Sequence, residues 1–201
     1  MGDHRDRPCK FFDIAFEHGF SVRDAQLEFS SERGAVIVVV MGVAGSGKSV
    51  VGKALAALYH ASFLEGDEFH PGKNLRKMRD GEALSDDDRS PYYAALRSRL
   101  LDAATAGESV VLACSALQAK HRAVLTVSSE LRFVHLIASS DLLHERLESR
   151  ADHFFNPALL ESQLATLEQP TEVTAVNAFV DPRDSVSDLA TRCFDALEAR
   201  A

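Results

Sequence analysis

The 201-residue sequence has few cysteines, no long apolar run and fewer basic than acidic residues, and each shortage excludes a class of protein. The three cysteines, Cys9, Cys114 and Cys193, are odd in number and lack CxxC spacing, so neither a disulfide framework nor a zinc site is predicted. No apolar run could cross a bilayer and no apolar core follows the charged first residues, so we expect a soluble, cytoplasmic protein. Because the net charge is −8, we expect no binding to nucleic acid or to membrane surfaces.

The composition, 46% hydrophobic and 26% charged, predicts one globular domain with a sizeable core. We place that domain at residues 35–201 and interpret residues 1–34 as an N-terminal extension. Phenylalanines recur in the extension at helical spacing, so it is either a short amphipathic helix or a loosely ordered tail.

Strand-like and helix-like segments alternate from residue 36 onward. The expected strands are 36–41, 62–64, 110–113, 131–137 and 175–180. The expected helices are 48–59, 91–106, 117–127, 142–150, 158–167 and 186–199. Strands joined by helical crossovers predict an α/β three-layer sandwich, with a central parallel five-stranded sheet flanked by helices. Ligands of such sheets bind beyond the carboxyl ends of the strands.

The first expected strand leads directly into the pattern GxxxxGKS. In this setting the backbone N–H groups of the turn and the positive end of the following helix form a nest for a triphosphate. The lysine of the pattern reaches the β- and γ-phosphates, and its serine binds Mg²⁺. The residues concerned are Gly42, Val43, Ala44, Gly45, Ser46, Gly47, Lys48 and Ser49. The sequence therefore predicts a nucleotide-binding protein.

A carboxylate and a histidine follow the second strand. Asp67 would lie across from the phosphate nest, where it could take a proton from an attacking hydroxyl. Because Asp and Gly also mark turns, an acidic turn before a short helix is the alternative. His70, which precedes Pro71, is either a loop histidine or a ligand contact.

Arginines and three adjacent aspartates come next. The run Asp86 to Asp88 lacks the alternate spacing of a calcium loop, so we expect it to orient Arg79 or Arg89. We also expect a helix to begin here, with Ser90 as N-cap and Pro91 at its first position. A guanidinium group grips a carboxylate with two parallel hydrogen bonds, so the arginines indicate an acidic substrate.

Polar residues after the third strand and basic residues further on complete the candidates. Ser115 and Gln118 fit a capping box, and Arg122, one helical turn later, is expected to face the same cleft. Arg146 and Arg150 share a helix face. They are either solvated surface arginines or charges beside a mobile flap that stabilise a transferring phosphoryl group.

Six segments taken together resemble the gluconate kinase (gluconokinase) family: MGVAGSGKS, HPGKNLRKM, DGEALSDDDRSP, VVLACSAL, RADHFF and LATLEQP. The resemblance covers about residues 36–171. It implies the P-loop NTPase fold of the nucleoside monophosphate kinase type, which shikimate kinases share. It also implies phosphorylation of D-gluconate by ATP with Mg²⁺ to give 6-phospho-D-gluconate, feeding the pentose phosphate route. Gluconate is an anion, as the arginines require.

The resemblance also implies a role for individual residues. It makes Lys48, Asp67 and Arg150 catalytic, and adds Arg146 and Arg150 to the nucleotide site as parts of a lid at about 146–160. The resemblance implies a substrate-binding region at about 68–92. The residues implied for the sugar-acid site are Asp67, His70, Arg79, Arg89 and Ser115, of which Asp67 and Ser115 lie outside that region.

Three positions depart from the family pattern. Glu65 stands where Asp is common, Tyr92 where Trp is common, and Gln118 where Lys is common. Glu65 keeps its charge on a longer arm, so an indirect role toward Mg²⁺ beside Ser49 survives. Gln118 removes a positive contact, for which Lys120 or Arg122 could compensate.

Other functions stay open beside this one. The nearest is a kinase of another small hydroxy acid, such as shikimate, or of a nucleoside monophosphate. A P-loop switch or binding protein is disfavoured, because the NKxD guanine-reading pattern is missing and the arginine-rich region would have no role. Members of the resembled family are often dimers, so a homodimer is one assembly to expect.

Overall fold

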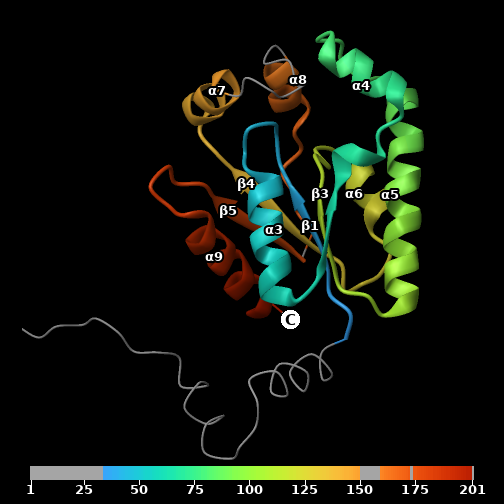
Figure 1. Ribbon diagram of the computed structural model, residues 1–201, viewed down its shortest axis with the longest axis vertical. Coiled ribbons are helices and arrows are strands. Elements are labelled where there is room, and N and C mark those ends of the chain that lie inside the picture. The colour runs from blue at the N-terminus through green and yellow to red at the C-terminus, as the bar shows by residue number, and fades with distance from the viewer. Residues whose placement is uncertain (1–33, 150–158, 173, 201) are drawn as a thin grey trace, which may run out of the picture. The chain divides into compact units, whose positions relative to one another are not determined.

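A parallel β-sheet forms the centre of the protein. The computed structural model describes residues 34–149, 159–172 and 174–200, and the fold below is that of the compact unit Ala35–Ala201. The sheet has five strands in the order β2-β3-β1-β4-β5 (Figure 1). The strands are β1 (Ile37–Met41), β2 (Ser62–Glu65), β3 (Val110–Ala113), β4 (Arg132–Ile137) and β5 (Ala175–Phe179). The register places Val39 of β1 opposite Leu112 of β3 and Phe133 of β4.

Helices cover both faces of the sheet. They are α3 (Lys48–Tyr59), η1 (Gly66–Phe69), α4 (Gly72–Arg79), α5 (Asp86–Ala106), α6 (Ala119–Leu125), α7 (Ser140–Glu148), α8 (Leu159–Thr166) and α9 (Val186–Glu198). Every residue of β1 is apolar and buried, and its side chains alternate between two cores. Val39 and Met41 pack with α5 and α6, whereas Val38 and Val40 pack with α3 and α9. The predicted three-layer architecture is confirmed.

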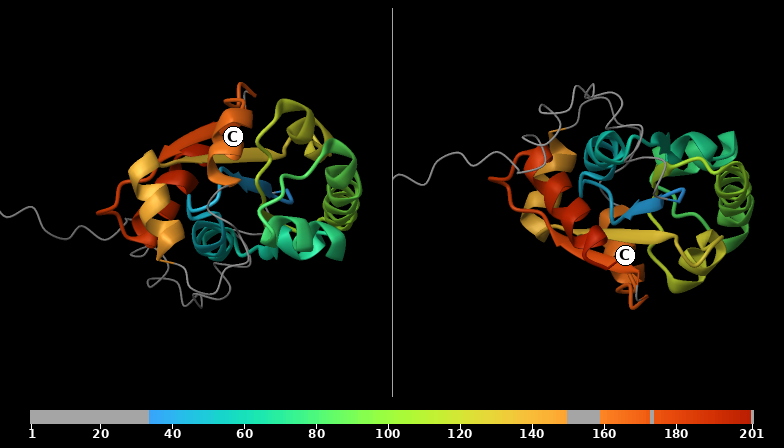
Figure 2. Two further views of the ribbon diagram at one scale, coloured as in Figure 1. Left: turned by 90° about the horizontal axis from the view of Figure 1, so that it is seen from above. Right: turned by 90° about the horizontal axis from the view of Figure 1, so that it is seen from below.

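A third apolar cluster lies at the carboxyl edge of the sheet. Val43 of the loop after β1 packs there with Leu143 and Leu147 of α7 and with Leu160 of α8. This packing holds α7 and α8 against that loop. Figure 2 looks down on this edge in its left view, with α5 at one flank of the molecule and α7 at the other.

The helix α5 begins four residues before the predicted serine cap. Ser85 is the N-cap: its hydroxyl accepts from the Asp88 N–H, and the Asp88 carboxylate accepts from the Ser85 N–H, which is a capping box. Three acidic residues lie in the first turn, where their negative charge stabilises the helix by interacting with the positive end of its dipole. The prediction of Ser90 as N-cap is therefore wrong, and Pro91 lies inside the helix.

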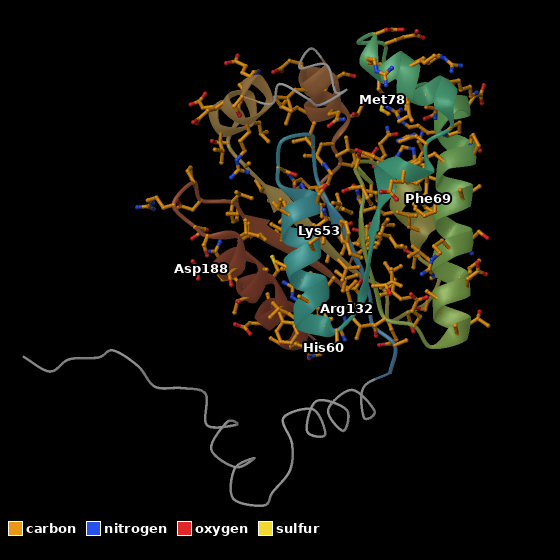
Figure 3. The ribbon with its side chains drawn as sticks, in the orientation of Figure 1. Lys53, His60, Phe69, Met78, Arg132 and Asp188 are labelled. Carbon is orange, nitrogen blue, oxygen red and sulfur yellow. The ribbon has the colours of Figure 1, made fainter. Side chains whose placement is uncertain are left out.

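A polar network lies at the amino-terminal edge of the sheet, opposite the carboxyl ends of the strands. Arg132 at the start of β4 pairs with Glu198 at 3.2 Å, and the Tyr59 hydroxyl donates to the same carboxylate at 3.0 Å. Figure 3 labels both Arg132 and His60, the C-cap of α3, in the lower part of the sheet domain. None of the helices within the described ranges is long and apolar enough to span a membrane.

Candidate active site

The loop between β1 and α3 has the backbone shape that a phosphate nest requires. Gly42 and Gly47 have φ values of +143° and +98°, which side-chain-bearing residues rarely adopt. A Cβ atom at Gly42 would lie 2.8 Å from the Leu136 carbonyl oxygen and 2.9 Å from Ser46 Oγ. Helix α3 starts directly after Gly47, so its positive end faces the loop. The Lys48 ammonium turns back over the loop and donates to the Val43 carbonyl at 2.9 Å.

One cavity, of ≈ 220 Å³, lies beside the loop between α3, α7 and the segment after β5. Arg146 of α7 forms part of its wall and donates to the Gly45 carbonyl oxygen at 3.3 Å. The opposite wall carries Asp181 and Asp184 together with apolar side chains. Its lining residues are Gly45, Ser46, Gly47, Val50, Val51, Arg146, Ser149, Val180, Asp181, Asp184, Ser185, Val186 and Leu189.

A second cavity, of ≈ 70 Å³, lies on the other side of the strand ends, between α4, α5, α6 and α8. Met78, which Figure 3 shows on α4 above Phe69 of η1, belongs to its wall. Its lining residues are His70, Met78, Glu82, Ala83, Leu84, Arg89, Tyr92, Tyr93, Ser115, Leu117, Gln118, His121, Ser162, Gln163 and Thr166.

Two histidines of this cavity are stacked on neighbouring tyrosines of α5. The rings of His70 and Tyr92 lie 3.7 Å apart and those of His121 and Tyr93 lie 4.3 Å apart. Burial lowers the pKa of His70, and burial with the nearby Arg89 lowers the pKa of His121 to about 4. Both rings are therefore neutral at pH 7, and Arg89 is the cationic side chain among the described lining residues.

Asp67 follows β2 at the carboxyl edge of the sheet and is not among the lining residues of either cavity. It is half-buried on η1, immediately after Gly66. A Cβ atom at Gly66 would lie 2.4 Å from the Ala113 carbonyl oxygen, so only glycine lets η1 approach the end of β3 this closely. Burial raises the pKa of Cys114 to about 12, which Lys48 opposes and Asp67 reinforces. Both charges thus act on one thiol at the end of β3.

Ser115 lies in the wall of the smaller cavity and not in a helix cap. Helix α6 begins at Ala119, and its N-cap Gln118 makes no side-chain capping bond. The Ala119 N–H donates instead to Glu168 Oε2, at 2.7 Å. The predicted capping box of Ser115 and Gln118 is therefore wrong, because a carboxylate from a distant segment satisfies the first turn.

The two arginines proposed for an acidic substrate separate in space. Arg89 lines the smaller cavity, whereas Arg79 is exposed at the end of α4 and is not part of the described wall. Of the three adjacent aspartates, Asp86 and Asp88 form ion pairs with lysines of the described part of the chain and not with Arg79 or Arg89. Asp88 contacts Lys77 at 2.9 Å, and the Asp88 pKa is held far below its usual value by that contact.

Arg122 does not face the cleft as expected. Its side chain is 1% exposed and its Nε donates to Glu172 Oε1 at 2.6 Å. Lys120, the other candidate to replace a lost positive contact, pairs with Asp86 at 2.6 Å on the surface. Arg150 and most of the predicted lid at 146–160 lie outside the described residues.

Gln163 and His121 are two of the lining residues of the smaller cavity that sequence reasoning missed. Gln163 of α8 accepts a hydrogen bond from the Ala44 N–H at 2.7 Å, so one side chain contacts the phosphate loop and lines the other cavity. No local sequence pattern predicts this hydrogen bond, because the two residues are 119 positions apart. His121 lies three residues after Gln118, and that helical spacing was the available signal.

Comparisons with known proteins agree on one family. Residues 37–170 match the family model described as AAA domain. The chain is 39% identical over 173 residues to a probable gluconokinase of Dictyostelium discoideum, covering 81% of this chain and 86% of that protein. It is 40% identical over 135 residues to the thermoresistant gluconokinase of Escherichia coli, covering 67% and 77%. The crystal structure of a gluconokinase from Sinorhizobium meliloti superposes with a TM-score of 0.73 at 41% identity, covering 83% and 94%.

Proposed function

This chain belongs to the gluconokinase family, and we propose that it phosphorylates D-gluconate with ATP to give 6-phospho-D-gluconate. The observation that carries the proposal is the pairing of two cavities at the carboxyl edge of the sheet. One adjoins a phosphate-binding loop, and the other is small and contains a cation suited to a carboxylate. A kinase needs both a donor and an acceptor site, and the two cavities suit these two roles.

The larger cavity and the loop form the donor site. The backbone N–H groups from Gly45 to Ser49 and the Lys48 ammonium bind the triphosphate. Arg146 closes the wall of a slot whose apolar side chains suit a planar base. The Ser49 hydroxyl and the Glu65 carboxylate fit Mg²⁺, which prefers oxygen ligands and keeps several waters. When bound, Mg²⁺ neutralises charge on the phosphates.

The smaller cavity forms the acceptor site. Arg89 binds the gluconate carboxylate, because a guanidinium offers two parallel donors to it. His70 and Ser115 bind hydroxyl groups of the sugar chain. Both histidine rings are neutral, so the positive charge that attracts the substrate is concentrated on Arg89.

Asp67 acts on the reacting hydroxyl of gluconate. It lies on η1, directly after β2 at the carboxyl edge of the sheet, and orients that hydroxyl toward the γ-phosphoryl group while accepting its proton. Lys48 and the arginines of α7 and the lid, Arg146 and Arg150, stabilise charge on the transferring group. Most of the catalytic effect comes from positioning and electrostatics, as is general for phosphoryl transfer.

A substrate panel at fixed ATP and Mg²⁺ tests the proposal. We expect purified protein to convert D-gluconate into 6-phospho-D-gluconate with release of ADP. Shikimate and nucleoside monophosphates are the comparison acceptors, and turnover with one of them but not with gluconate would refute the assignment. Cytoplasmic location and a homodimer belong to the same proposal. Deleting residues 1–34 and comparing activity and sedimentation tests the role of the extension.

A further inference from the structure

Asn74 of α4 has one defined amide orientation. The residue is completely buried, and its Nδ2 donates to the Asp88 backbone oxygen at 2.7 Å. A carbonyl oxygen can only accept, so the NH₂ group and not the oxygen of the amide faces it. The same NH₂ group lies 3.4 Å from His70 Nδ1.

This orientation determines the protonation of His70. The amide has a second N–H to donate, so His70 Nδ1 is the acceptor of that bond and carries no proton. In a neutral ring the proton is then on Nε2. Nε2 has no hydrogen-bond partner among the described residues, and His70 lines the acceptor cavity.

The surroundings keep the ring neutral and fixed in direction. Tyr92 stacks on it with an interplanar angle of 3°. Burial lowers the pKa of His70, the Asp67 carboxylate opposes this shift and the Arg89 guanidinium adds to it. Glu82, Tyr92, Tyr93 and His121 are the other titratable side chains that line the same cavity.

We infer that Asn74 is a positioning residue, which holds His70 in the tautomer that presents Nε2–H to a hydroxyl oxygen of the acceptor. The inference rests on the proposed function, and it divides recognition between two side chains. Arg89 binds the carboxylate and His70 donates to an uncharged oxygen. A ligand with a carboxylate but without a hydroxyl at that place would lose the second contact.

Nitrogen NMR of the histidine rings tests the tautomer without any turnover. Two-bond ¹H–¹⁵N correlation spectra of the full chain at pH 7.5 distinguish a protonated Nε2 from a protonated Nδ1. We expect the Nε2–H form for His70. His135 is the internal reference, because its Nδ1 faces the oxygen of Asn177 at 3.1 Å and should be protonated. A proton on Nδ1 of His70 would overturn the inference even if gluconate is phosphorylated.

The substitution Asn74→Asp tests the inference through the pH dependence of the gluconate KM. A carboxylate can only accept, so it would move the proton to Nδ1 and raise the pKa of His70. Nε2 then keeps a proton only while the ring is charged. We expect the gluconate KM of the variant to rise about tenfold between pH 6 and pH 8.5, the equivalent of one hydrogen bond, and that of the wild type to stay level. Parallel profiles for the two proteins would contradict the inference.

Two substitutions of His70 give a test that does not require altering the buried amide. Glutamine places a donor near the position of Nε2, whereas asparagine reaches only the position of Nδ1. We expect His70→Asn to raise the gluconate KM about tenfold above that of His70→Gln, with similar ATP KM values. Equal gluconate KM values would refute the donor role. If neither wild type nor variants use gluconate while the Nε2–H form is observed, the proposed function fails and the tautomer assignment stands.

Discussion

Arg122 offers a sharp test of how the acceptor wall is held. Its guanidinium is 1% exposed and pairs with Glu172, while Nη1 donates to the carbonyl oxygens of Ala116, Leu117 and Glu168 at 3.0–3.2 Å. Arg122→Met keeps much of the stem and removes every one of these donors. The change isolates the charge and its hydrogen bonds from the packing of the side chain.

The magnitude follows from what is left behind. Breaking a buried ion pair by removing one partner costs about 3–5 kcal/mol. The Glu172 side chain is 30% exposed and regains part of its hydration, so we expect the lower end, about 3 kcal/mol. With an m-value of about 2 kcal/mol/M in urea, the unfolding midpoint should fall by about 1.5 M. Total stabilities of about 5–15 kcal/mol leave the variant folded enough to assay.

Urea unfolding followed by circular dichroism and tyrosine fluorescence measures this change. Lys120→Met is the matched control, because Lys120 lies on the same helix and its partner Asp86 is likewise on the surface. An exposed pair contributes about 0–1 kcal/mol, so the control midpoint should barely move. In its folded fraction Arg122→Met should also raise the gluconate KM, since the carbonyls it anchors follow Ser115. Equal midpoints for the two variants would refute the reasoning.

Three further substitutions test the chemistry of the site. Asp67→Asn should lower kcat about 100-fold or more at an almost unchanged ATP KM, and an unchanged kcat would remove Asp67 from the mechanism. Gln163→Leu should raise the gluconate KM about three- to tenfold and reduce the effect of gluconate on the affinity for a non-hydrolysable ATP analogue, as calorimetry would show. Gly66→Ala should lower kcat/KM and the thermal midpoint together, because its methyl group meets the Ala113 carbonyl oxygen at 2.4 Å; Gly34→Ala, in open space, is its control.

The sheet and the phosphate loop could be predicted because their signals are local. The valine run of β1 and the glycines after it are read from neighbouring residues, and the observed Ile37–Met41 differs from the prediction by one residue. The start of α5 was harder, since Ser85 and Ser90 both precede plausible first turns. Contacts of Asp88 with Lys77 and Asn74 of α4 accompany the earlier start, and they depend on tertiary structure.

The rest of the site depends on contacts between distant segments. Glu168, 49 residues away, bonds the first turn of α6 and leaves Ser115 to the cavity wall. Arg122 pairs with Glu172, which is 50 residues away in the sequence. Helical spacing relates only residues of one helix, so it could not predict this ion pair. Family resemblance placed His70, Arg89 and Ser115 at the acceptor site, and the structure brings these three together. The role of each in binding stays a prediction.

Because Gln163 contacts the phosphate loop at Ala44 and also lines the smaller cavity, we expect binding of one substrate to change the affinity for the other. A side chain that belongs to the acceptor wall occupies an N–H of the phosphate loop, so a ligand that displaces or tightens this bond changes both sites. Linkage is reciprocal: whatever factor ATP applies to the affinity for the acid, the acid applies to the affinity for ATP. A dissociation constant measured for either substrate alone therefore describes a different protein state from the one that turns over.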